Sequence, residues 1–247
     1  MMAPKSHTLF HFTKGKETLE KILKNGFWPR YCLEDIRWVD QSDADYIAFP
    51  MVCFCDIPLS RISEHVGFYG SFGLGMTKDW ANKNSLNPLL YLASSNNLSS
   101  EIRSLNKHAG KCKTDDDIKE AKETMRYIYM HIKPSDGNML VDGKPVEKEF
   151  YQESEWRFVP KNENIKPYMF KDKFDDEDTL NAENAKTLEH TSLKFTPDDI
   201  KYIFVKSDSD IPGIVNFIQT ELDHFPAADL KILLSRIVSI ESIQADL

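Results

Sequence analysis

The sequence predicts an α+β fold in which helices flank a mixed β-sheet. Short apolar runs typical of strands recur along the chain and alternate with segments of helical period. The chain has 247 residues, of which 41% are hydrophobic and 28% charged, which suffices for a packed core. No glycine-rich phosphate loop of the P-loop or dinucleotide-binding type is present, because "GSFGLG" follows a helix and opens a strand.

The first part of the chain gives the clearest elements. Residues 8–12 are expected to form a strand, and residues 13–27 a helix that ends at Gly26 and has one apolar face formed by Leu19, Ile22 and Leu23. Residues 28–49 carry aromatic side chains without a clean period and are interpreted as an ordered loop. The next expected elements are strands at 50–58, 71–77 and 87–94 and helices at 59–70 and 78–84.

The second part begins with a helical pattern over about residues 96–134, which predicts an insertion on the sheet. A strand follows at 154–160, and residues 170–186 are interpreted as a mobile loop. The start signal at 196–199 places a brief helical turn before a strand at 201–206. A helix at 211–222 and a strand at 231–240 complete the expected single domain, residues 1–247.

Charge and composition narrow the class of protein. The net charge of −8 argues against a broad basic surface for duplex nucleic acid. No apolar run approaches the roughly 20 residues that span a bilayer, and the N-terminus lacks a secretory pattern, so we expect a cytoplasmic protein with no membrane partner. Cys53 and Cys55 would share one side of a strand, and buried free thiols are favoured over a metal site.

Three stretches carry a family resemblance. "LFHFTKGKETLEKILKNGFWPRYCLED", "FPMVCFCDIPLSRISEHVGFYGSFGLGMTKDWA" and "ESEWRFVP" together resemble the AbiGi family of abortive phage-infection proteins. The resemblance covers most of the chain and is clearest in its first ninety residues. Members of that family are described as the antitoxin half of a two-gene system, which implies a cognate toxin as partner.

The order of the motifs also resembles ADP-ribosyltransferases of the His-Tyr-Glu type, which implies a largely antiparallel sheet of that type and NAD as cofactor and substrate. His11 would then orient the ribose of NAD, supported by Thr13, while Tyr69 would stack on nicotinamide. Arg30 is a candidate for binding a phosphate of NAD. The catalytic carboxylate would be Glu155, with Glu153 as the alternate: it would stabilise the positive charge that develops on the ribose.

Each of these residues also has a structural interpretation. His11 can be a core histidine and Tyr69 a packing residue, with the middle motif centred instead on Phe68 or Phe72. The glutamates can lie on an exposed strand edge, and Glu155 can pair with Arg157 or with Lys161.

The sequence therefore supports two functional hypotheses. The first is an NAD-dependent ADP-ribosyltransferase that acts as the effector, or toxin, of an abortive-infection antiphage system and modifies a nucleic acid or a protein. The alternative is a catalytically inactive antitoxin that neutralises a partner toxin. A nuclease lacks support, because no paired carboxylates at metal-binding spacing are present.

Overall fold

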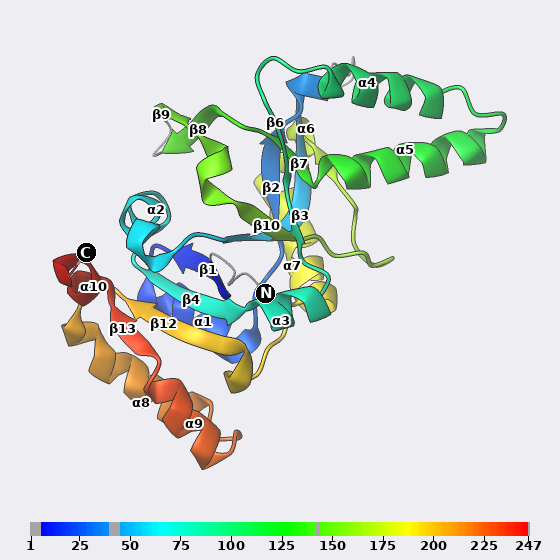
Figure 1. The fold of residues 1–247 in the computed structure, drawn as a ribbon. Coiled ribbons are helices and arrows are strands. Elements are labelled where there is room, and N and C mark those ends of the chain that lie inside the picture. The colour runs from blue at the N-terminus through cyan, green and yellow to red at the C-terminus, as the bar shows by residue number, and fades with distance from the viewer. Residues whose placement is uncertain (1–5, 40–44, 142–143, 247) are drawn as a thin grey trace. The chain divides into compact units, whose positions relative to one another are not determined.

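A computed structural model describes residues 6–39, 45–141 and 144–246, and Figure 1 shows its elements. The chain divides into two compact units. Unit 1 comprises residues 1–28, 53–86 and 192–247, and unit 2 comprises residues 29–52 and 87–191. Helices and strands are interspersed. The strand pairs β12–β13 and β6–β7 are parallel, whereas β1–β3, β1–β4, β4–β12, β2–β3, β3–β11, β5–β10 and β8–β9 are antiparallel. The predicted α+β fold with a mixed, mostly antiparallel sheet is confirmed.

The elements of unit 1 are β1 (Thr8–Thr13), α1 (Lys16–Asn25), α2 (Ile62–Tyr69), β4 (Phe72–Thr77), α3 (Lys78–Lys83), β12 (Ile200–Val205), α8 (Ile211–Glu221), α9 (Ala227–Leu234), β13 (Ile237–Ser239) and α10 (Ile240–Asp246). Those of unit 2 are β2 (Arg30–Asp35), β5 (Asn87–Pro88), β6 (Leu90–Leu92), α4 (Leu98–Ala109), α5 (Asp115–Tyr129), β7 (Ile132–Pro134), β8 (Gly137–Val141), β9 (Lys144–Lys148), β10 (Glu155–Phe158), β11 (Met169–Phe170), α6 (Lys171–Phe174) and α7 (Glu177–Thr191). The long strand β3 (Tyr46–Cys55) begins in unit 2 and ends in unit 1.

Unit 1 is a sheet with helices on both faces. Its strands are ordered β13-β12-β4-β1, and the end of β3 pairs with β1 at Phe10 and Cys55. Because side chains alternate along a strand, Phe10 and Phe12 join one core cluster with residues of α2 and α10. His11 points to the opposite side, where Phe27 and Phe54 contact it.

Helix α1 forms as its sequence predicts. Leu19, Ile22 and Leu23 are its buried residues, so one apolar stripe holds it against the sheet. The helix ends at Gly26, whose φ of 81° favours glycine. A Cβ atom at Gly26 would lie 2.6 Å from the carbonyl oxygen of Leu193, where the chain at Phe27 forms a β-bridge with Leu193. Glycine is therefore required here by both conformation and space.

Unit 2 places β2 and β11 on β3, with Ala48 paired to residues of both strands. Helix α7 packs on β2 through polar side chains: Asn184 Oδ1 accepts a hydrogen bond from the Tyr31 amide at 3.0 Å. Thr187 Oγ1 donates to the carbonyl oxygen of Pro29 at 2.5 Å. These side chains satisfy backbone groups of β2 and of the residue before it, as a neighbouring strand would.

Two predicted loops are wrong. Segment 28–49 contains β2 and the start of β3, and its residues 40–44 lie outside the described residues. Most of β2 is only half-buried, so its pattern carries no clean alternation. Segment 170–186 forms α6 and most of α7 rather than a mobile loop. The buried face of α7 is polar and includes Glu183, Asn184 and Thr187, which removes the apolar periodicity that marks a helix.

Two predicted strands are divided differently. Segment 87–94 separates at Leu89 into β5, which pairs with β10, and β6, which pairs with β7. Segment 231–240 begins as the end of α9 and becomes strand only at Ile237, because a continuous apolar run does not distinguish helix from strand. The brief turn at 197–199 before β12 and the helical content of 96–134, as α4 and α5, are confirmed. That 96–134 is an insertion in one domain stays a prediction.

Candidate functional site

His11, the first predicted site residue, lies in β1 of unit 1 within an aromatic cluster. Its Nδ1 donates a hydrogen bond to the carbonyl oxygen of Cys53 at 2.8 Å. Its ring lies 5.1 Å from that of Phe27 and 5.5 Å from that of Phe54. Burial lowers the pKa of His11, and the hydrogen bond to Cys53 opposes that shift only in part. These contacts hold the half-buried imidazole against the aromatic cluster and favour its neutral form.

Thr13 and Tyr69 also belong to unit 1. Thr13 is the last residue of β1 and pairs with Phe72 of β4. Its carbonyl oxygen faces Gly70, which has a φ of 109° and leaves no room for a Cβ atom. Tyr69 ends α2 and packs against the core cluster that contains Phe10, with its ring 4.4 Å from that of His65. Tyr69 therefore has a packing role in this unit.

The other three predicted residues, Arg30, Glu153 and Glu155, belong to unit 2. Arg30 is exposed at the start of β2, opposite Met51 in the register. Glu153 and Glu155 are both buried, which differs from the exposed strand edge that their sequence context suggests. The left-handed Ser154, with a φ of 46°, separates the 3₁₀ turn that contains Glu153 from β10, which begins at Glu155.

Glu155 lies at the centre of a buried ionic network. Its Oε1 accepts a hydrogen bond from Arg157 Nε at 2.6 Å, and its Oε2 accepts one from Lys133 Nζ at 2.9 Å. Its backbone amide donates to the hydroxyl of Tyr91 at 2.7 Å. Both carboxylate oxygens therefore bind cations, one from its own strand and one from β7.

The network continues in both directions as an alternation of charges. Glu153 lies 3.9 Å from Lys133 Nζ and 2.5 Å from Lys148 Nζ. At the other end, Arg157 Nη2 lies 3.1 Å from Glu34 Oε2, and its Nη1 donates to the carbonyl oxygen of Met130 at 2.9 Å. Three cations and three anions thus balance, and we call these six residues the ionic core: Lys148, Glu153, Lys133, Glu155, Arg157 and Glu34.

The carboxylates keep Lys133 charged. Burial alone would lower the pKa of Lys133, but Glu155, Glu34 and Glu153 outweigh that effect and raise it above its ordinary value. Its ammonium group also lies 4.3 Å from the centre of the Phe150 ring. A carboxylate that is to stabilise developing positive charge must offer unneutralised charge to the substrate. The negative charge of Glu155 is instead matched by Lys133 and Arg157, an arrangement that suits structural support.

Lys133, Lys148, Glu34 and Tyr91 were not expected at this site. The alternative pairing of Glu155 with Arg157 was considered from sequence and is confirmed. Lys133 fell inside a segment interpreted as helical, and Glu34 inside a segment interpreted as a loop, so neither could be assigned to a strand facing Glu155. The single available signal was the alternation of charge and aromatic residues in "EWRF", which is typical of a strand with one polar face.

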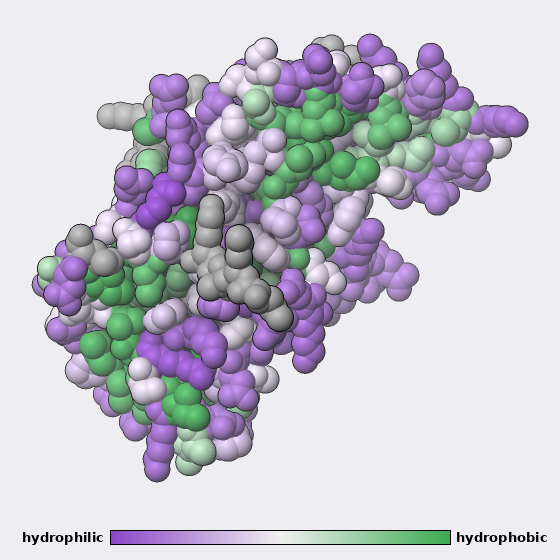
Figure 2. Space-filling model, in the orientation of Figure 1, coloured by the Kyte–Doolittle hydropathy of each residue, from purple (hydrophilic) through white to green (hydrophobic). Residues whose placement is uncertain are grey.

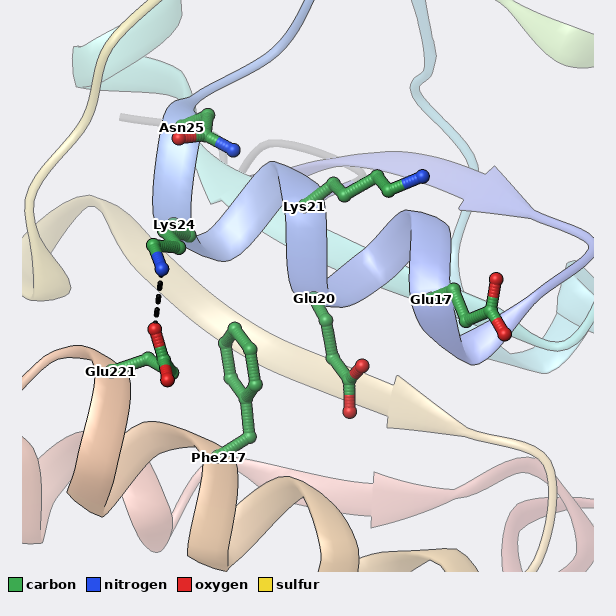
Figure 3. Close-up of a pocket in the computed structure, with 7 residues that line it drawn as sticks. All are labelled: Glu17, Glu20, Lys21, Lys24, Asn25, Phe217 and Glu221. Carbon is green, nitrogen blue, oxygen red and sulfur yellow. Dashed lines mark hydrogen bonds and ion pairs between the residues drawn. The ribbon is translucent and has the colours of Figure 1, made fainter.

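A pocket of about 380 Å³ lies on unit 1 between α1 and α8. Figure 3 shows Phe217 pointing from α8 toward α1, with Glu20 beside its ring. Lys24 and Glu221 form an ion pair of 2.5 Å at one end. The lining residues are Glu17, Glu20, Lys21, Lys24, Asn25, Phe217 and Glu221, and they include none of the six predicted site residues. Within the described ranges, no group of histidine, cysteine or acidic side chains has the arrangement of a metal site.

Comparison with known proteins shows that the chain is similar to abortive phage resistance proteins. The chain is 30% identical over 252 residues to the abortive phage resistance protein AbiGi of Lactococcus lactis subsp. cremoris, a match that covers 89% of this chain and 99% of the relative. A family model described as the abortive phage resistance protein AbiGi, antitoxin, matches residues 25–206. The chain belongs to the AbiGi family. No solved structure matches it.

The main functional prediction, a toxin that acts as an ADP-ribosyltransferase, is wrong, because the family is described as an antitoxin. The order His, Tyr, Glu is weak evidence, because a chain with 7 histidines, 9 tyrosines and many glutamates contains these residues in that order by chance. The ADP-ribosyltransferase type of the sheet has no support from a solved structure. The roles given to the six site residues, catalysis and NAD binding stay predictions. No helix in the described part of the chain is long and apolar enough to cross a membrane.

Proposed function

We propose that this chain is an antitoxin-type binding protein that neutralises a partner toxin protein. The observation that carries this is the match of residues 25–206 to the AbiGi family, which is described as an antitoxin. The matched range includes every residue of the ionic core, which lies between Glu34 and Arg157.

The geometry of the ionic core supports a binding role. An antitoxin must hold a binding surface in shape, and it needs no free reactive group. The ionic core links β2, β7, β9 and β10 with the turn that contains Glu153, and every pair of charges except Glu155–Arg157, which lies within β10, fixes one element against another. Such networks require good geometry to offset the cost of burial, so they favour a single arrangement of these strands. In this proposal Glu155 supports the structure of unit 2.

The test uses the protein encoded next to this gene as the partner. Expressed alone, that protein should stop growth, and co-expression with this chain should restore growth. The two proteins should also copurify. Normal growth when the neighbouring protein is expressed alone, or arrested growth without copurification when both are present, would remove the antitoxin assignment. Incubation of the purified chain with labelled NAD provides the second arm, and neutralisation should proceed without NAD consumption.

A further inference from the structure

The helical hairpin of α4 and α5 exposes apolar side chains that its own fold does not cover. Figure 1 shows the two helices running antiparallel and joined by a short connection. Lys122 Nζ of α5 donates hydrogen bonds to Asn106 of α4, to the carbonyl oxygen at 2.9 Å and to Oδ1 at 2.8 Å, which fixes their register. The buried residues of the two helices are Ile102, Ala109, Met125 and Tyr129, and the ring of Tyr129 also contacts that of Trp38.

Three large apolar residues of this hairpin are exposed: Leu98 to 43%, Leu105 to 55% and Ile128 to 40%. Leu98 and Leu105 are seven residues apart and so lie on the same side of α4. The register set by Asn106 and Lys122 places Leu98 level with the last turn of α5, which contains Ile128. Figure 2 shows hydrophobic residues gathered over α4 and α5 on the face in view. Exposed apolar side chains that gather in this way are typical of an interaction site.

Opposite charges lie side by side at the tip of the hairpin. The end of α4 and the connection carry Lys107, Lys111 and Lys113, and α5 begins with Asp115, Asp116 and Asp117. All six are exposed, and within the described ranges none of them makes an ion pair. We call the lysines the basic tip and the aspartates the acidic tip. The basic tip also interacts favourably with the dipole at the end of α4, and the acidic tip with the dipole at the start of α5. A test must therefore separate this stabilisation of the helices from binding between two copies.

This pattern is complementary to itself. When two hairpins stack face to face about a twofold axis parallel to their length, α4 of one copy lies over α5 of the other. The basic tip of each copy then meets the acidic tip of its partner, twice per dimer. In the other face-to-face arrangement, with the twofold axis perpendicular to the helices, α4 lies antiparallel on α4 and the charged tips lie at opposite ends, so they do not meet. The charges therefore select one pairing, and the exposed leucines and isoleucine would form its apolar centre.

We infer that the α4–α5 hairpin is a self-association surface, through which two copies of this chain pair as an isologous four-helix bundle. The inference stands on the exposed apolar residues and the charge pattern, and it does not require the proposed antitoxin function. It assigns the helical segment 98–129 a partner of defined chemistry, a second copy of the same segment.

The first experiment measures molar mass by light scattering over a range of protein concentrations. The wild-type chain should form dimers, and Leu105→Glu should weaken dimerisation by on the order of a hundredfold, since one change removes two contacts from a symmetric interface. Ile232→Glu is the matched control, because Ile232 is 48% exposed on α9 outside the hairpin, and its dimer should persist. Circular dichroism checks that each variant is folded.

The second experiment exchanges the charges. A variant with Lys107→Glu, Lys111→Glu and Lys113→Glu, and another with Asp115→Lys, Asp116→Lys and Asp117→Lys, should each be mainly monomeric. An equal mixture of the two should form mixed dimers, which a change of helix stability alone cannot produce. A mixture that stays monomeric would overturn the inferred pairing. A monomeric wild-type chain whose Leu105→Glu variant loses the toxin would overturn self-association and assign this surface to the toxin.

Discussion

The interiors of the two units differ in their buried charges. Unit 1 has an interior of aromatic and aliphatic side chains, with Phe10, Phe27 and Phe204 among its largest buried residues. Unit 2 also contains a fully buried arginine, Arg157, as one of six alternating charges. Hydrophobic contacts are non-directional and tolerate volume-conserving substitutions, whereas buried charges depend on particular partners. Unit 2 should therefore be the more sensitive to single substitutions.

The largest effect is expected at Arg157. Arg157→Met keeps the bulk of the side chain but removes the cation that faces Glu155 and Glu34, leaving both carboxylates without it. Breaking a buried ion pair in this way costs about 3–5 kcal/mol of unfolding free energy. Urea denaturation measures the loss. Arg157→Lys, which keeps the charge but not the planar geometry, should lose less, and a loss below about 1 kcal/mol in the Met variant would contradict a structural role for the ionic core.

The second effect concerns the contact between α7 and β2. Asn184→Ala removes the acceptor of the Tyr31 amide and leaves a buried donor unsatisfied, at a cost of about 1–3 kcal/mol. Asn181→Ala, at an exposed position of the same helix, is the matched control and should change stability by less than about 0.5 kcal/mol. Equal stability of the two variants would show that the side chain of Asn184 does not support β2.

The third effect tests how well unit 1 tolerates the substitution of a buried apolar side chain. Leu74 is fully buried in β4, and Leu74→Met conserves volume without removing a polar partner. The expected loss is below about 1.5 kcal/mol. Its comparison with Arg157→Met, measured by the same denaturation, gives the contrast between the two interiors directly. A larger loss in Leu74→Met than in Arg157→Met would reverse that contrast.

The smallest effect is the dependence of stability on pH. Burial lowers the pKa of His11 in unit 1 and of His131 in unit 2 below 6.5, so the unfolded chain binds more protons than the folded chain below that pH. The contribution of these two neutral histidines to the free energy of unfolding is complete above about pH 6.5. It is lost as the pH falls toward their pKa values in the folded chain. His11→Asn keeps a donor for the Cys53 carbonyl without titrating, and it should reduce the fall in stability between about pH 7 and 5. An unchanged slope would refute this, and adding His131→Asn should flatten the slope further.

The sequence predicted elements well where local and tertiary preferences agree. Helix α1 has an apolar stripe and a terminal glycine, and both appear as expected. Prediction from the sequence failed for α7 and β2, because their contact is polar. The hydrogen bond that joins them connects Tyr31 and Asn184, which are 153 residues apart in the chain. The ionic core was only partly visible for the same reason. Glu155 and Arg157 are neighbours in sequence, but Lys133 and Glu34 meet them only through the fold.

The most direct test of the central claim measures toxin neutralisation by Glu155→Gln per folded molecule. The folded fraction comes from denaturation, toxin affinity from titration, and protection from growth under co-expression. We expect a less stable protein whose folded molecules bind and neutralise the toxin as well as the wild type does. A folded Glu155→Gln variant that still binds the toxin but no longer protects the cell would give the carboxylate a chemical role and contradict the account.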